Sequence, residues 1–230
     1  MVEGCRVIGP TSATGLARFL DRGLLMPKAF ATPIKLAVFA LIVVGLYVLF
    51  IHEDRVVLPP GVKAPDEPVQ VNIEPLVVYE YDDHQVTAVA RFNLQAKVLG
   101  RERYRLGNES TLSPIDLVLG WQRMSDQSVV DEISISQYGR WYRWEADTLP
   151  ISVRDIERCS ANMHMIPKND RVREKLLAVR TGEIVAVEGY LVNVWASGGW
   201  TWNTSTTRED TGGGACEIIW VESFEVVETD

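Results

Sequence analysis

Residues Glu183 to Trp195 read EIVAVEGYLVNVW, and this stretch decides the fold. Its apolar side chains fall on both faces of an extended chain, which is typical of a central strand. Gly189 within the stretch indicates a bulge or a sharp bend. Ser197-Gly198-Gly199 then predicts a tight turn, and residues 200–204 are expected to return as the hairpin partner.

The flanking segments predict an antiparallel, β-rich α+β domain. Strands are expected over residues 86–99, 134–144 (with a kink at Gly139), 157–166 and 215–227. Helix starts are expected at Ser113, running to about Leu119, at Ser125-Asp126, and at Asn169-Asp170. The last helix followed by the pattern G-E-x-V-x-V-x-G-x-L and a hairpin resembles part of an OB-like Greek-key barrel over about 60 residues.

Charge and hydropathy divide the chain into three parts. Residues 1–35 hold five basic and two acidic residues, residues 36–51 are uncharged, and residues 52–230 carry a net charge of −11. Leu36 to Ile51 reads LAVFALIVVGLYVLFI, and a helix over 34–51 is roughly 27 Å long, enough to cross a bilayer. A single transmembrane helix is therefore expected, because a buried core helix would carry a polar stripe and a signal peptide a cleavage site.

The basic flank predicts the orientation. Residues 1–33 are expected in the cytoplasm and the rest outside, which in a bacterium means an inner-membrane protein with a periplasmic domain. Within residues 1–33, four apolar residues on one helical face predict a short amphipathic helix, with a disordered tail as the alternative. Membrane lipid is thus an expected partner, whereas the acidic balance excludes a general nucleic-acid binder.

A proline-rich segment separates the membrane helix from the domain. Residues 52–69 contain LPPGVKAPDEP, which predicts a semi-rigid extended linker, so the domain is expected to occupy residues 70–230. Cys159 and Cys216 lie in the part expected outside, where an oxidising compartment favours a disulfide between them. Two buried free thiols are the alternative.

Few residues point to catalysis. If residues 157–166 form a strand, Ser160, Asn162 and His164 share one face as a polar row, which is either a site or a surface or structural feature. The loop TSTTREDTGGG contains Arg208 and Asp210 and is either a ligand-binding loop or a flexible hairpin tip. A phosphate-binding loop is excluded because a strand follows it. Familiar catalytic and cofactor motifs are missing from the sequence, so no cofactor and no metal site is expected.

Tryptophan is the other candidate for binding chemistry. All seven lie between residues 121 and 220. Exposed aromatic side chains stack on sugar rings or anchor protein interfaces, whereas buried ones only pack. The candidate ligand-binding side chains are Trp141, Trp144, Trp200, Trp202, Asn162 and Arg208.

The segments LSPIDLVLGW, ISQYGRWYRW, SANMHMIP and TREDTGGGACEIIWVE resemble a group of uncharacterised bacterial membrane-anchored proteins. The resemblance covers roughly residues 90–222. It implies a bacterial origin and no catalytic residue, because that group has no assigned activity.

Three functions are compatible with these features. A non-catalytic accessory or scaffold subunit of a membrane or envelope complex, partnered with other membrane or envelope proteins, is the first. An envelope module that binds glycan through its tryptophans is the second. A periplasmic hydrolase using His164 with Ser160 or Asp210 is the third.

Overall fold

The computed structural model describes residues 33–50, 55–81, 83–107, 109–207 and 216–228, in two units that we treat separately. The first unit contains helix α1, Pro33–Phe50, which begins at the proline as the sequence predicts. Apolar side chains are exposed around its described part, from Leu36 to Val44. No helix in the described ranges meets the combined length and hydropathy required for a membrane span. The anchor and the localisation therefore stay predictions, and the amphipathic helix expected within residues 1–33 lies outside the described residues.

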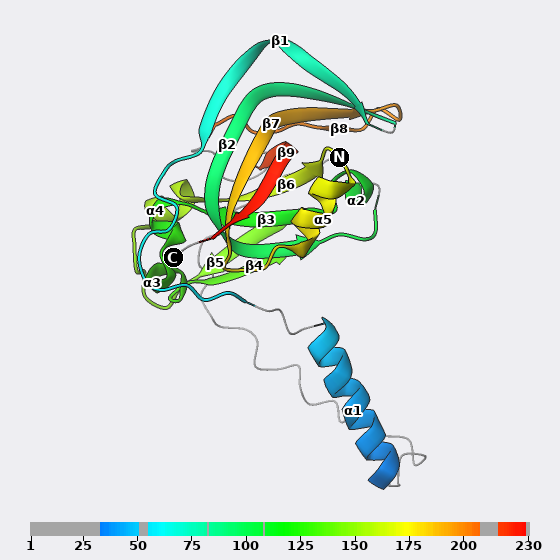
Figure 1. Cartoon of the computed structure of the whole chain (residues 1–230), viewed down its shortest axis with the longest axis vertical. Coiled ribbons are helices and arrows are strands. Elements are labelled where there is room, and N and C mark those ends of the chain that lie inside the picture. Colours follow the sequence, from blue (N-terminus) through cyan, green and yellow to red (C-terminus); the bar gives the residue numbers. More distant parts are fainter. Residues whose placement is uncertain (1–32, 51–54, 82, 108, 208–215, 229–230) are drawn as a thin grey trace. The chain divides into compact units, whose positions relative to one another are not determined.

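The domain is built on a mixed, mostly antiparallel sheet with two edge strands (Figure 1). Its strands are β1 Val69–Tyr81, β2 His84–Arg103, β3 Ile115–Gly120, β6 Ser160–Pro167, β7 Ile184–Ala196, β8 Thr201–Trp202 and β9 Glu217–Val227. Five of them pair in a closed order, β2-β3-β6-β9-β7, because β7 also pairs with β2. The β6–β9 contact is parallel, and the others are antiparallel. The β-rich α+β class predicted from the sequence is confirmed.

Short helices and one hairpin complete the domain. The helices are α2 Glu109–Leu112, the 3-10 helix η2 Gln122–Ser125, α3 Gln127–Val130, α4 Val153–Arg158 and α5 Asp170–Ala178. Strands β4 Ser134–Tyr138 and β5 Trp141–Glu145 form a separate two-stranded sheet. The caps of α3 and α5 are the predicted ones, because Asp126 accepts from Ser128 N and Asn169 accepts from Val172 N.

Three predicted elements are wrong. The single strand expected over residues 134–144, with a kink at Gly139, is the hairpin of β4 and β5, whose chain reverses at Gly139 and Arg140. The expected helix from Ser113 to Leu119 is strand β3, in which all six residues are buried, so apolar packing on both faces outweighs the capping pattern. The expected strand over 157–166 begins instead with the end of α4, which Ser152 caps by accepting from Asp155 N. Only from Ser160 onward is this segment a strand.

The long strands contribute to two hydrophobic clusters on opposite faces of the sheet. Odd-numbered residues of β7 such as Val187 and Leu191 face the larger cluster, inside the closed order of strands. Val192 and Val194 face the smaller one. A register shift between Ala88 and Ala90 lets β2 contribute to both. The bulge predicted at Gly189 is present, and an added Cβ there would lie 2.0 Å from the Trp220 carbonyl oxygen.

The proline-rich segment, residues 55–68, is extended and bound to the domain; we call it the strap. Backbone N–H groups along it donate to Thr181 O, the Gln127 amide, the Asp126 carboxylate and the Ser125 hydroxyl, at 2.8 to 3.2 Å. At its start, Gly182 adopts φ +94°, and an added Cβ would lie 1.8 Å from Val56 O. Only a glycine therefore leaves room for the strap at this point.

Candidate functional site

The polar row predicted on β6 exists, and it is buried. Ser160, Asn162 and His164 are each at most 4% exposed. The Ser160 hydroxyl lies 3.1 Å from that of Tyr142 and donates to Ile156 O, whereas Asn162 accepts from Gln137 Nε2 at 2.9 Å. Since Tyr142 and Gln137 belong to the β4–β5 hairpin, the row is the surface on which that hairpin packs.

Arg140 is the centre of this contact, at the tip of the hairpin. Gly139 and Arg140 have φ values of 60° and 67°, as the two central residues of a type I′ turn require. The Arg140 guanidinium donates to Asp116 Oδ1 at 2.7 Å and to Ser113 O at 3.0 Å. Its carbon lies 4.1 Å from the centroid of the Tyr104 ring and 5.1 Å from that of Trp202. The turn is thus stabilised by the ion pair of Arg140 with Asp116 and by cation–π contacts with two aromatic rings.

His164 joins the same group from β6. Its Nδ1 lies 2.9 Å from Asp116 Oδ1, outside hydrogen-bond alignment, and its ring centroid is 4.6 Å from that of Trp202. Asp116 is fully buried, and its Oδ2 has no hydrogen-bond partner among the described residues. Burial and the Asp116 charge raise the pKa of Tyr104, so this phenol stays neutral and donates or accepts without adding charge. We call Tyr104, Ser113, Asp116, Arg140, His164 and Trp202 the Arg140 cluster.

The Arg140 cluster is an ion pair between Arg140 and Asp116, surrounded by the polar and aromatic side chains that contact it. Asp116 neutralises Arg140, whose guanidinium is fully committed to protein partners and therefore is not offered to an anionic ligand. The structure does not bring Ser160 to His164, because the two residues are four positions apart on one strand, a separation of about 13 Å. Within the described residues, no group of three or more His, Cys, Asp or Glu side chains is suited to a metal ion.

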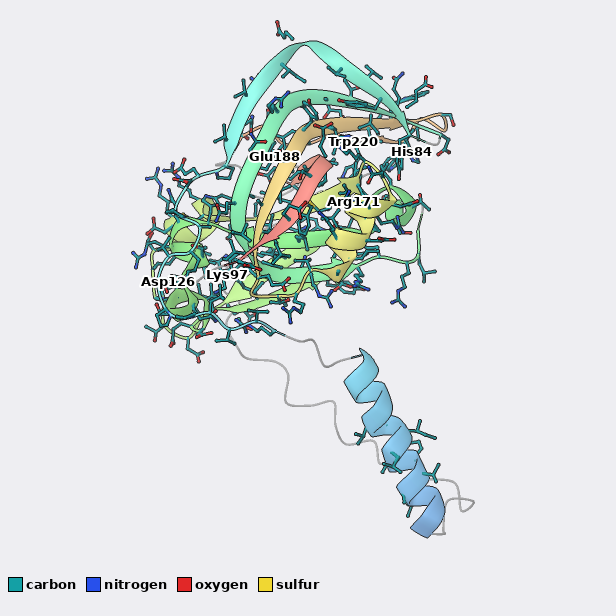
Figure 2. The ribbon with its side chains drawn as sticks, in the orientation of Figure 1. His84, Lys97, Asp126, Arg171, Glu188 and Trp220 are labelled. Carbon is teal, nitrogen blue, oxygen red and sulfur yellow. The ribbon has the colours of Figure 1, made fainter. Side chains whose placement is uncertain are left out.

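The predicted ligand-binding side chains do not form one surface. Trp144 and Asn162 are buried, and Trp141, Trp200 and Trp202 are half-buried. Trp200 and Trp202 do lie together, with ring centroids 5.8 Å apart, at the rim of the smaller hydrophobic cluster. Figure 2 marks Trp220, the centre of that cluster, whose ring stacks on Tyr79 at 5.2 Å. Arg208 and Asp210 lie outside the described residues.

The predicted disulfide between Cys159 and Cys216 is wrong. Cys159 carries a free, buried thiol that donates to Gln122 Oε1 at 3.2 Å. The β6–β9 register pairs Met163 with Glu217 and so sets Cys216 beside residue 162, about 10 Å along the strand from Cys159. That separation exceeds the Cα distance of about 7 Å that a disulfide tolerates. Burial raises the pKa of the Cys159 thiol, which lowers the fraction present as the nucleophilic thiolate.

A buried lysine, Lys97, lies on strand β2. Lys97 is 1% exposed and its Nζ lies 2.5 Å from Gln127 Oε1, the same atom that accepts from Leu58 N of the strap. Gln127 in turn donates to Asp131 at 2.7 Å. Burial and the Arg55 charge lower the pKa of Lys97 to about 8. Figure 2 shows Lys97 and Asp126 on this side of the domain.

Sequence reasoning missed Asp116 and Arg140. A lone acid within the apolar run IDLVLG was a usable signal, because a carboxylate buried in a strand needs a cation. It also missed Leu106 and Tyr138, which are 91% and 88% exposed and flank the cluster in sequence. Comparison with known proteins finds no matching family model, no matching curated protein and no matching solved structure.

Proposed function

We propose that this chain is a non-catalytic accessory subunit of a membrane or envelope complex, which binds its partner through Leu106 and Tyr138. A hydrolase is not favoured, because the only serine–histidine pair in the predicted set is about 13 Å apart along one strand. Glycan binding by Trp141, Trp144, Trp200 and Trp202 is not favoured either, because Trp144 is buried and the last two complete a hydrophobic cluster.

The observation that carries the proposal is the exposure of two large apolar side chains beside a rigid cluster. Tyr138 precedes the turn that Arg140 anchors, and Leu106 lies two residues after Tyr104, whose hydroxyl accepts from Arg140 N at 2.9 Å. Preorganised apolar and aromatic side chains are the usual anchors of protein interfaces, since little freedom is lost when they bind.

Two further features support a membrane location for this subunit. The uncharged run of residues 36–51 and the exposed apolar side chains of α1 support an anchor in the bacterial inner membrane. The basic flank before it supports a cytoplasmic N-terminus and a periplasmic domain. Lipid and other membrane or envelope proteins are the partners that follow from this arrangement.

The closed order of strands supports a finer description of the fold. We infer an OB-like Greek-key barrel, in which β2, β3, β6, β7 and β9 are the five strands. The parallel β6–β9 contact and the helix α5 between the third and fourth strands support it. The Arg140 hairpin would then cover the outer face of β3 and β6.

The test is purification of the full chain from native membranes in mild detergent. The unaltered chain should elute as a complex with a stoichiometric partner, and the double variant Leu106→Ser/Tyr138→Ser should elute alone. Val69→Ser, which alters another exposed side chain, is the matched control and should keep the complex. A monomeric unaltered chain, or a complex that survives the double variant, would overturn the proposal.

A further inference from the structure

One exposed row of side chains crosses four neighbouring strands. The register pairs Glu80 of β1 with Gln85 of β2, Gln85 with Trp195 of β7, and Trp195 with Thr201 of β8. Residues directly opposite one another in antiparallel strands share a face, with Cβ atoms about 5 Å apart. The four side chains therefore form a continuous line about 14 Å long across the sheet.

This line is solvent-exposed and lies on a rigid support. All four residues are exposed, and Trp195 retains 47% of its surface. A second row, formed by Val78, Thr87 and Asn193, runs beside it on the same face. The other face of these strands packs Val86 and Val194 into the smaller hydrophobic cluster. Figure 1 shows β1, β8 and the adjoining parts of β2 and β7 together at the end of the domain away from α3 and α4. We call the two rows, seven residues in all, the Trp195 face.

We infer that the Trp195 face binds a neutral oligosaccharide. An exposed indole covers the C–H face of a pyranose ring and removes both apolar surfaces from water. The amides of Gln85 and Asn193 and the hydroxyls of Thr87 and Thr201 donate to and accept from sugar hydroxyls around that ring, and the Glu80 carboxylate accepts from them. Carbohydrate recognition uses this combination of an aromatic surface with neighbouring polar groups.

Charge selects the class of sugar. The Trp195 face contains one carboxylate and no lysine or arginine, so an anionic saccharide would meet Glu80 without a compensating cation. The same argument disfavours nucleic acid.

The fixed positions of Trp195 and Asn193 also favour oligosaccharide binding. Trp195 is paired on both sides, with Gln85 and with Thr201, so its backbone is fixed before any ligand arrives. The Asn193 side chain accepts from Thr204 N at 3.0 Å, which fixes that amide too. Little conformational freedom remains to be lost on binding.

Titration of the full chain in detergent with cellotetraose and with chitotetraose tests the inference. We expect heat of binding by calorimetry with one or both neutral tetrasaccharides below about 10 mM. Trp195→Ala should weaken binding at least about tenfold, and Gln85→Ala should weaken it less. Tetragalacturonate, which is anionic, should bind more weakly than either neutral probe.

Leu149→Ala is the matched control. It removes a side chain that is 47% exposed, as Trp195 is, but lies outside the Trp195 face, and it should leave sugar binding unchanged. Failure of the partner interaction through Leu106 and Tyr138 would leave this inference standing, because the two surfaces share no residue. Absence of binding by both neutral probes, unchanged binding in Trp195→Ala, or preference for tetragalacturonate would each overturn it.

Discussion

Replacing Lys97 with methionine should stabilise the domain at neutral pH. The ammonium group of Lys97 is buried and finds an amide oxygen rather than a carboxylate as its nearest partner. Methionine is unbranched and apolar, so it fills the same space without a charge. The Gln127 oxygen keeps the Leu58 N–H of the strap as a donor, so the substitution leaves no unsatisfied acceptor.

The magnitude follows from the pKa. Lowering the pKa of Lys97 from 10.5 to about 8 corresponds to about 3 kcal/mol of destabilisation when the lysine is charged in both states. Loss of the hydrogen bond to Gln127 offsets about 1 kcal/mol of the gain. The net effect of Lys97→Met at pH 7 is therefore about 2 kcal/mol of added stability.

The sign of the stability change caused by Lys97→Met depends on pH. Below pH 8 the folded and the unfolded chain both carry the charge, and the whole destabilisation is present. Between pH 8 and 10.5 the folded chain is neutral while the unfolded chain still binds a proton, so the destabilisation falls as pH rises. Above 10.5 it is gone, and the methionine variant should be the less stable of the two.

Urea unfolding followed by tryptophan fluorescence is the assay. All seven tryptophans lie between residues 121 and 220, so the signal reports on the domain even in the full chain. Lys168→Met, at an exposed position, is the control and should show no such pH dependence. The reasoning is refuted if Lys97→Met lowers the free energy of unfolding at pH 7, or if its advantage does not shrink between pH 8 and 10.

Three other outcomes are expected. Asp116→Ala should lower the free energy of unfolding by about 3 to 5 kcal/mol because it leaves Arg140 without its carboxylate, and adding Arg140→Met should recover part of this loss in urea unfolding. Gly182→Ala should free the strap, seen as faster proteolytic cleavage before residue 68; cleavage at the unaltered rate would contradict the steric argument. The Cys159 thiol should react with iodoacetamide only after unfolding, whereas a peptide linking it to Cys216 in mass spectrometry would contradict the register.

Short sequence patterns predicted those elements that depend on interactions between residues close in the sequence. Asn169 and Asp126 begin their helices through side chains that accept from backbone N–H groups within three residues, so a short window of sequence contains the whole interaction. Gly189 marks a close approach of two strands, which only the absence of a side chain allows. These features can therefore be predicted from the sequence without knowledge of the fold.

Long-range pairing decided what could not be predicted. Ser113-Pro114-Ile115-Asp116 has the pattern of a helix start, but Asp116 meets Arg140 across the fold and its neighbours are buried on both faces of a strand. The cysteine pair failed for the same reason, because the parallel register of β6 and β9 is set by the whole sheet. The β6 polar row was visible in the sequence, but its burial beneath the hairpin was not.

The strap makes the domain's connection to the preceding chain extensible. Tension applied ahead of Arg55 is borne first by the bond from Val56 N to Thr181 O, then by those of Leu58 and Gly61, and only afterwards by β1. Stepwise release of residues 55–68 would lengthen the tether by up to about 45 Å without breaking a single strand pairing. The hydrogen bonds along the strap therefore set how much of residues 55–68 is available to the chain that precedes the domain.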